Sequence, residues 1–192
     1  MRWLVGLWTA YVVGGMLALG YHASVPGNAA QPPRRIAADV PGGPPAGKAT
    51  LLLFLHPQCP CSRATIGELA RAVSRRSGGL DTRLFFYRPG DSPPGWEKTD
   101  LWQMAEGIPG TRLFADADGA LAARFGVRTS GQALLYDPEG GLVFAGGMTG
   151  ARGHAGDNSG QSAILSWFSS GHVSVESTPV FGCSLASGSP GP

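Results

Sequence analysis

Two cysteines, Cys59 and Cys61, flank Pro60 in the segment FLHPQCPCSRATIGEL, which covers residues 54–69. A thiolate is both a nucleophile towards disulfides and a ligand for soft metal ions. The pair therefore predicts either thiol–disulfide exchange or metal binding. A third cysteine, Cys183, stands in the C-terminal part of the chain, and an odd count leaves at least one thiol unpaired or intermolecular.

The elements expected around the pair favour a reactive sulfur. Residues 50–55 form a short, continuous apolar run, which is typical of a strand buried on both faces. Residues 62–76 then place apolar side chains at helical spacing, with arginines largely on the other side. We expect Cys59 and Cys61 at the start of this helix, where unpaired N–H groups and the helix dipole favour a thiolate. Two side chains of the same segment are expected to add positive charge, His56 and Arg63.

The short spacing of the two cysteines bears on their redox chemistry. A disulfide between Cys59 and Cys61 closes a smaller, more strained ring than a Cys-Xaa-Xaa-Cys disulfide, and strain makes a disulfide more oxidising. We interpret Cys59 as the attacking sulfur, whose mixed disulfide is resolved by Cys61 or by Cys183. The sequence leaves open whether Cys183 takes part or is a thiol of the tail without consequence.

A polar, glycine-rich loop at residues 151–160 is the second candidate part of the site. His154, steadied by Asp157, is interpreted as a base or positive neighbour for the attacking cysteine, and Arg152 as a residue that shapes the site. The alternative is a self-contained polar turn in which Asp157 or Asn158 caps the following helix.

A metal site is the alternative use of the same residues. His56, Cys59 and Cys61 give a compact set of one nitrogen and two sulfurs, which suits Cu(I) or zinc. A copper-binding or copper-delivering protein is therefore kept as a hypothesis. No phosphate-cradling glycine motif follows a strand, so no organic cofactor is expected. The net charge of +2 is too small to indicate nucleic-acid binding.

The order of the remaining elements indicates an α/β sandwich. A second strand is expected at residues 82–87, and a β-hairpin joins residues 133–136 to 142–145. This order predicts a central mixed sheet packed against helices. The other expected elements are a helix at 100–106, a strand at 111–115, a helical turn at 121–125 and a closing helix at 161–169.

Residues 1–23 are predicted to be a membrane anchor. Residues 3–21 carry no charge, and a helix of that length matches the roughly 30 Å hydrocarbon core of a bilayer. A cleavable signal peptide, with Ala18-Leu19-Gly20 as its small-residue cleavage site, is the alternative. Both interpretations place the rest of the chain outside the cytoplasm.

Many of the 30 glycines and 16 prolines lie in the two segments on either side of the expected domain. Residues 24–48 are expected to be a Pro/Gly-rich, semi-stiff linker that holds the domain away from the bilayer. Residues 172–192 form a Gly/Ser-rich tail, and residues 49–171 remain as one domain with a core of its own. The 43% of hydrophobic residues excludes disorder of the whole chain.

The strand–Cys–helix turn resembles that of the thioredoxin superfamily, especially the membrane-tethered periplasmic proteins of the TlpA/ResA kind. Their W-C-P-P-C-R-x-x-x-P-E-L motif places the nucleophilic cysteine on Cys59 and the resolving cysteine on Ser62. The cis-proline position of that family falls on Gly131. The string His-Pro-Xaa-Cys-Pro-Cys, with residues 151–158 and 178–183, is similar to the anchored thioredoxin-like proteins of the RedB group.

The resemblance implies a membrane-tethered thiol–disulfide oxidoreductase that acts on protein cysteines. The domain would face the periplasm from a single-pass helix in a bacterial inner membrane, or be released there if the helix is cleaved. Because Ser62 and Gly131 depart from the family pattern, a thioredoxin-fold module that binds a partner without turnover is a further alternative.

Overall fold

A computed structural model describes residues 2–28, 30–43, 47–75 and 80–185 of the chain. The predicted α/β sandwich with a mixed sheet is confirmed. Its helices and strands follow the expected order, and each begins and ends close to the expected residues. They are α1 (Arg2–Ser24), β1 (Ala49–Leu55), α2 (Pro60–Arg75), β2 (Leu80–Arg88), α3 (Asp100–Glu106), β3 (Thr111–Ala117), α4 (Ala120–Arg124), β4 (Gln132–Tyr136), β5 (Leu142–Gly147) and α5 (Ser159–Ser170).

The five strands lie in the order β3-β2-β1-β4-β5. The first three strands of the chain run parallel, and β4 and β5 join the other side of β1 in antiparallel pairing. The central strand β1 thus pairs Leu53 with Leu84 on one side and with Ala133 on the other. All seven residues of β1 are buried, as expected for a strand covered on both faces.

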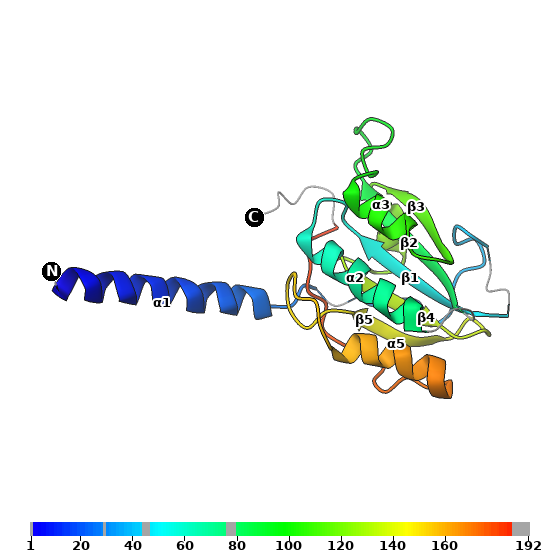
Figure 1. Cartoon of the computed structure of the whole chain (residues 1–192). Coiled ribbons are helices and arrows are strands. Elements are labelled where there is room, and N and C mark those ends of the chain that lie inside the picture. The colour runs from blue at the N-terminus through cyan, green and yellow to red at the C-terminus, as the bar shows by residue number, and fades with distance from the viewer. Residues whose placement is uncertain (1, 29, 44–46, 76–79, 186–192) are drawn as a thin grey trace.

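Two hydrophobic cores lie on opposite faces of the sheet. Helices α2, α3 and α5 cover one face, where Leu53 and Ile66 belong to the same buried cluster. The other face packs Phe54 and Phe125 against Val40 from the N-terminal linker and Leu185 from the C-terminal segment. Figure 1 shows α2 and α5 lying side by side across the sheet, with α1 projecting away from the domain. The two ends of the chain therefore supply part of the second layer.

The linker lies against the domain, a contact that its expected role as a semi-stiff spacer did not include. Val40 is only 1% exposed. The buried guanidinium of Arg83 donates hydrogen bonds to the carbonyl oxygens of Pro41 at 3.2 Å and Gly43 at 2.6 Å. A proline-rich segment has few N–H groups of its own, so its carbonyls take their partners from side chains of the sheet. Composition alone did not reveal this docking.

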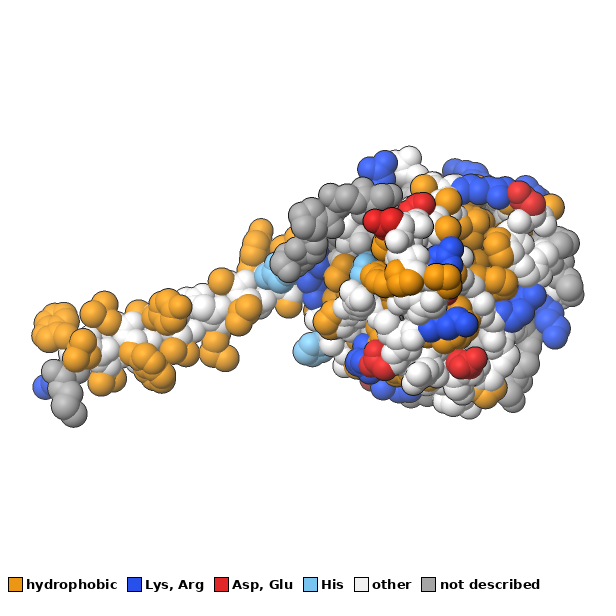
Figure 2. Space-filling view, turned by 90° about the horizontal axis from the view of Figure 1, so that it is seen from above, with side chains coloured by type: hydrophobic (Ala, Val, Ile, Leu, Met, Phe, Trp, Pro, Cys, Tyr) orange, Lys and Arg blue, Asp and Glu red, His pale blue; other side chains and the backbone are white. Residues whose placement is uncertain are grey.

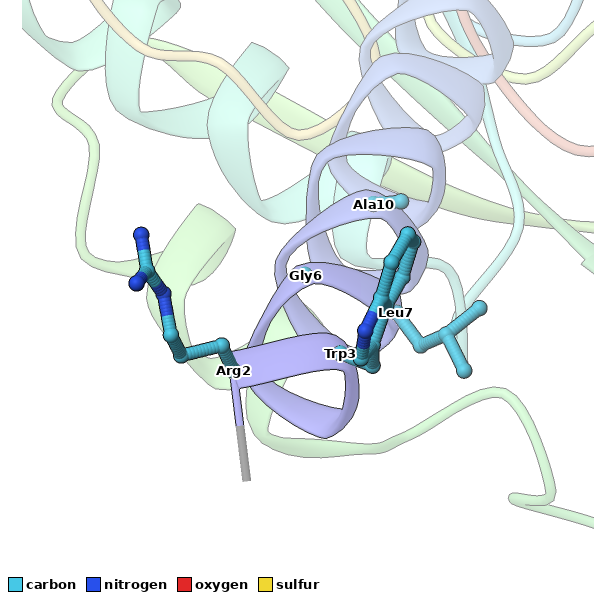
Figure 3. A pocket seen from close by; sticks show the side chains of 5 residues that line it. All are labelled: Arg2, Trp3, Gly6, Leu7 and Ala10. Atoms are coloured by element: carbon cyan, nitrogen blue, oxygen red, sulfur yellow. The ribbon is translucent and has the colours of Figure 1, made fainter.

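Helix α1 is long and apolar enough to cross a membrane by its length and composition. None of its residues is buried, and Figure 2 shows hydrophobic side chains along its whole described length. A shallow hollow lies near its start, and in the close view Trp3 and Leu7 lie on one side of the helix while Arg2 points away from them (Figure 3). This hollow is ordinary relief on an exposed helix surface.

Candidate functional site

Cys59 lies directly before the first residue of α2. Its carbonyl oxygen accepts hydrogen bonds from the N–H groups of Ser62 at 3.0 Å and Arg63 at 3.4 Å, so the first turn of the helix closes on Cys59 itself. Cys59 is 1% exposed and Cys61 is 6% exposed. The burial of β1 and the amphipathic pattern of α2 fix this position, because the strand must end where the helix turns back over the sheet.

Three cysteine sulfurs come together at this turn. The Cys59 sulfur accepts hydrogen bonds from the thiol of Cys183, from the thiol of Cys61 and from the N–H groups of Ser62 and Cys183. These bonds outweigh burial and hold the pKa of Cys59 far below its ordinary value. The bond to Cys59 and burial raise the pKa of both Cys61 and Cys183. These shifts favour a negative charge on Cys59 over one on Cys61 or Cys183.

Arg152 supplies the positive charge closest to these sulfurs. Its guanidinium acts on Cys61 and Cys183, where it opposes the rise of their pKa values. One guanidinium nitrogen donates to the carbonyl oxygen of Gly182 at 2.6 Å, and the buried Nε has no hydrogen-bond partner among the described residues. The backbone N–H of Arg152 donates to the carbonyl oxygen of Ala23 at 3.0 Å. Arg152 thus connects the cluster, the C-terminal segment and the end of α1.

Cys183 reaches the site on a segment that we call the C-terminal strap, residues 178–185. The N–H of Ser130 donates to the carbonyl oxygen of Cys183 at 2.8 Å, and an antiparallel bridge joins Thr129 to Ser184. A Cβ atom on Gly182 would lie 1.9 Å from the carbonyl oxygen of Ser130. The strap can approach this closely only because residue 182 is glycine.

His56 lies beside the cluster with its imidazole held by aromatic rings. The ring stacks on Tyr87 at a centroid distance of 5.6 Å and meets Trp96 edge-on at 6.1 Å. Its Nδ1 accepts from the N–H of Gln58 at 3.2 Å. Burial lowers the pKa of His56, against a smaller opposing effect of the charge on Cys59. Within the described ranges, no group of three or more His, Cys, Asp or Glu side chains is arranged to hold a metal ion.

Ser62 occupies the place of the second cysteine in the family motif and has a structural contact there. Its buried hydroxyl donates to the carbonyl oxygen of His56 at 2.8 Å and lies 2.7 Å from the hydroxyl of Ser130. The N–H of His56 in turn donates to Ser130 at 2.8 Å. These bonds join the end of β1, the first turn of α2 and the turn before β4. Ser130 could not be predicted as part of the site, because a lone serine carries no signal of such a contact.

Gly131 is the residue that the sequence resemblance aligns with the cis-proline of thioredoxin-like proteins. Its φ of +91° lies in the left-handed region, and its N–H donates to the carbonyl oxygen of Phe54 at 2.7 Å. A proline has no N–H and a φ fixed near −65°. This backbone therefore excludes proline at residue 131, and glycine gives an additional hydrogen bond to the end of β1.

The positive charge of Arg63 does not act on Cys59 alone, because Arg63 forms an ion pair with Asp100 at the start of α3. These two residues and Cys59 line a small surface hollow together with Pro60 and Gln58. Cys59 therefore borders a small hollow on the surface of the domain. A partner sulfur approaching Cys59 would pass this ion pair.

The polar residues of the loop after β5 differ in their exposure and in their contacts. His154 and Asp157 are exposed, while Asn158 caps α5 by accepting from the N–H of Gln161 at 2.8 Å. The capping alternative is therefore confirmed for Asn158. Among the described residues, no interaction joins His154 to the sulfurs, so its role as a base stays a prediction.

A buried carboxylate holds this loop in place. Glu68 of α2 accepts hydrogen bonds from Gln161 at 2.7 Å and from the N–H of Gly156 at 2.5 Å, and it forms an ion pair with Arg71. Glu68 is completely buried. It links α2, α5 and the loop that carries Arg152. Its burial could not be predicted from the sequence, because a carboxylate on an amphipathic helix is ordinarily exposed to solvent.

No protein family and no curated protein matches the chain by sequence. The sheet order decides the fold: β4 is antiparallel both to the parallel β1-β2-β3 unit and to the edge strand β5, and a helix starts directly after Cys59. The fold is thioredoxin-like. Among solved structures, a hypothetical protein from Sinorhizobium meliloti 1021 is similar, with a TM-score of 0.61 and 20% identity over 86% of this chain and 96% of that chain.

Two further solved structures are similar to the chain. An uncharacterized conserved protein from Geobacillus kaustophilus has a TM-score of 0.60 and 18% identity over 87% of this chain and 95% of that chain. A secreted disulfide oxidoreductase of Mycobacterium tuberculosis has a TM-score of 0.42 and 21% identity over 50% of this chain and 66% of that chain. At these identities the likeness concerns the fold, and the chemistry must be argued from the site.

Proposed function

We propose that this protein is a thiol–disulfide oxidoreductase that acts on protein cysteines. The observation that carries the proposal is the hydrogen bonding of the Cys59 sulfur, which accepts from two thiols and two backbone N–H groups at the start of α2. A sulfur held as a thiolate at neutral pH is ready to attack a disulfide without a separate base. The role foreseen for His154 is then not required for activation.

The exchange needs two steps at the same sulfur. The Cys59 thiolate attacks one sulfur of a partner disulfide, a mixed disulfide forms, and the other partner sulfur leaves as a thiolate that takes a proton. A second thiol of this chain then attacks Cys59, which releases the partner's remaining sulfur. Cys61 is the resolving sulfur predicted from the sequence. Both steps reverse when the partner is a dithiol.

The setting of this reaction follows from α1. Its length and composition support a membrane anchor, and a thiol–disulfide function supports an oxidising compartment outside the cytoplasm. We therefore place the domain on the periplasmic side of a bacterial inner membrane, as in the anchored RedB group that the sequence resembles. A cleaved helix would leave the domain free in the same compartment.

A redox titration of the full-length protein tests the proposed function. Free thiols are counted by alkylation and mass measurement across a glutathione series, with the wild type beside Cys59→Ser and Cys61→Ser. We expect a reversible two-electron loss of two thiols that requires Cys59. The proposal fails if the thiols of the wild type never pair, as expected for a binding module without turnover.

The same titration with Cu(I) addresses the copper hypothesis. The proposed exchange predicts that the disulfide forms to the same extent after a chelator removes the added metal. Tight binding of one Cu(I) by thiols that remain reduced at every potential would support copper delivery and overturn the oxidoreductase proposal.

A further inference from the structure

We infer that Cys183, carried to the site by the C-terminal strap, is the cysteine that resolves the mixed disulfide on Cys59. The oxidised protein then holds a Cys59–Cys183 disulfide rather than a Cys59–Cys61 disulfide. This inference rests on the proposed thiol–disulfide exchange and assigns a third sulfur to it.

Direct contact between the two residues is the first support. The Cys59 sulfur receives hydrogen bonds from both the thiol and the backbone N–H of Cys183. Cys183 is partly exposed, whereas Cys59 and Cys61 are buried. The thiol beside Cys59 that retains access to solvent is therefore the one on the strap.

The backbone of the strap holds this thiol in place from both sides. The carbonyl oxygen of Cys183 accepts from Ser130, and the N–H of Leu185 donates to Arg128 at 2.9 Å. Upstream, the N–H of Gly27 donates to Val180 at 2.8 Å. Figure 1 shows the strap, coloured red, passing close to the start of α2. An attacking group fixed in this way reacts with an advantage in effective concentration.

The position of Cys61 makes it a poorer partner for a disulfide. Cys61 is the second residue of α2 and stands only two residues from Cys59, so a disulfide between them would close a small, strained ring. Pairing it with Cys59 would disturb the first turn, where Ser62 and Arg63 donate to the carbonyl oxygen of Cys59. Cys183 comes from a separate segment, so a disulfide to it leaves that turn intact.

The electron balance of the proposed cycle is complete with a protein disulfide as the oxidant. Cys59 attacks the partner disulfide, and one partner sulfur leaves as a thiol. The Cys183 thiol loses its proton and attacks the Cys59 sulfur, the mixed disulfide breaks, and the second partner sulfur leaves as a thiol. Two electrons pass from Cys59 and Cys183 to the partner disulfide, and a dithiol partner reverses the cycle.

Arg152 and Cys61 then have supporting parts in this cycle. The guanidinium of Arg152 faces Cys183 and Cys61 and favours the thiolate that Cys183 must form to attack. Cys61 remains a thiol that donates a hydrogen bond to Cys59. Its loss would weaken the Cys59 thiolate without removing the disulfide.

Peptide mapping of the oxidised full-length protein tests the assignment. Trypsin cleaves after Lys48, Arg63 and Arg152, so Cys59 and Cys61 share one peptide and Cys183 lies on another. We expect the two peptides to be linked in the wild type and in Cys61→Ser. Cys183→Ser should leave a mixed disulfide on Cys59 with added glutathione disulfide, resolved roughly tenfold or more slowly.

A second variant keeps all three cysteines and displaces the strap. Gly182→Ala places a Cβ against Ser130 and should reduce the Cys59–Cys183 linkage, while Gly150→Ala, whose Cβ meets nothing closer than 4.0 Å, should not. A disulfide within the Cys59–Cys61 peptide, with Cys183 free, would overturn the inference and leave the proposed function standing. Absence of any intramolecular disulfide would instead overturn both.

Discussion

The thiol of Cys183 donates a hydrogen bond to the sulfur of Cys59, although the two cysteines lie at opposite ends of the domain's sequence. The strap that carries Cys183 pairs with residues 128–130, directly before Gly131 and β4. The reactive turn is therefore built from three segments: the start of α2, the turn before β4 and the strap.

The charge on Cys59 predicts how alkylation depends on pH. Because its pKa lies far below the ordinary value, the rate of reaction of Cys59 with iodoacetamide should stay nearly constant between about pH 5 and 8. For an ordinary thiol with a pKa near 8.5, the rate would rise about tenfold for each unit by which the pH increases towards that pKa. Mass mapping of the alkylated peptide over time, with Cys59→Ser as the control, measures this. A tenfold rise per unit would contradict the assigned thiolate.

The same shifts predict opposite effects on stability at the two ends of the pH range. The lowered pKa of Cys59 stabilises the folded state fully above the unfolded value of about 8.5, and this stabilisation is lost progressively as the pH falls towards the folded value. The raised pKa values of Cys61 and Cys183 stabilise the folded state at pH values below the unfolded thiol pKa. This stabilisation is lost as the pH rises towards their folded pKa values. Urea unfolding of the reduced wild type and of Cys59→Ser measures this effect. The difference in the free energy of unfolding between the two proteins should disappear at low pH.

Arg152→Gln should slow the resolving step more than the first attack. Removing the guanidinium leaves the pKa of Cys183 higher still and breaks the bond to the carbonyl oxygen of Gly182. Resolution should slow by up to roughly tenfold, since one pKa unit changes the thiolate population tenfold. Stopped-flow measurement of both steps separates them. Arg128→Gln removes an equal charge from an exposed position nearby and should leave both rates unchanged.

Glu68→Ala should destabilise the domain by about 2–3 kcal/mol, because it leaves buried donors without their acceptor. Gln161 and the N–H of Gly156 both lose a bond in this variant. Chemical denaturation measures the change, and Glu106→Gln at the exposed end of α3 is the matched control. A loss no larger than in the control would show that Glu68 does not hold the loop.

Gly131→Ala should cost about 1–3 kcal/mol, since alanine at a left-handed φ is strained. The φ at this residue is +91°, and the new Cβ would lie 3.0 Å from the hydroxyl of Thr65. The free energy of unfolding, measured beside Gly150→Ala, checks the value. Gly131→Pro should destabilise further, because it also removes the bond to Phe54.

Most of the fold could be predicted because its elements carry strong local patterns. The continuous apolar run of β1 and the helical spacing of α2 identify the strand–helix turn, and with it the place of Cys59 and Cys61. The hairpin of β4 and β5 was visible in its turn residues. These signals are local, so they do not depend on what packs above or below the sheet.

The position of Cys183 could not be predicted because nothing local determines it. A Gly/Ser-rich segment has no periodicity that indicates which edge or turn it will pair with. The close approach of Gly182 to Ser130 becomes visible only with both segments in place. The docking of the linker could not be predicted for a similar reason, since the carbonyl partners of Pro41 and Gly43 come from Arg83, far along the chain.

The bond between Ala23 and Arg152 also bears on what processing of the chain can change. Ala23 lies beyond Gly20, the last residue of the candidate cleavage site, and Gly27, which bonds to the strap, lies further on. A signal peptidase acting there would release the domain but retain both contacts. Membrane attachment and sulfur chemistry are in this sense separable properties. Maturation would change where the protein encounters its partners but would leave the site that contacts them unchanged.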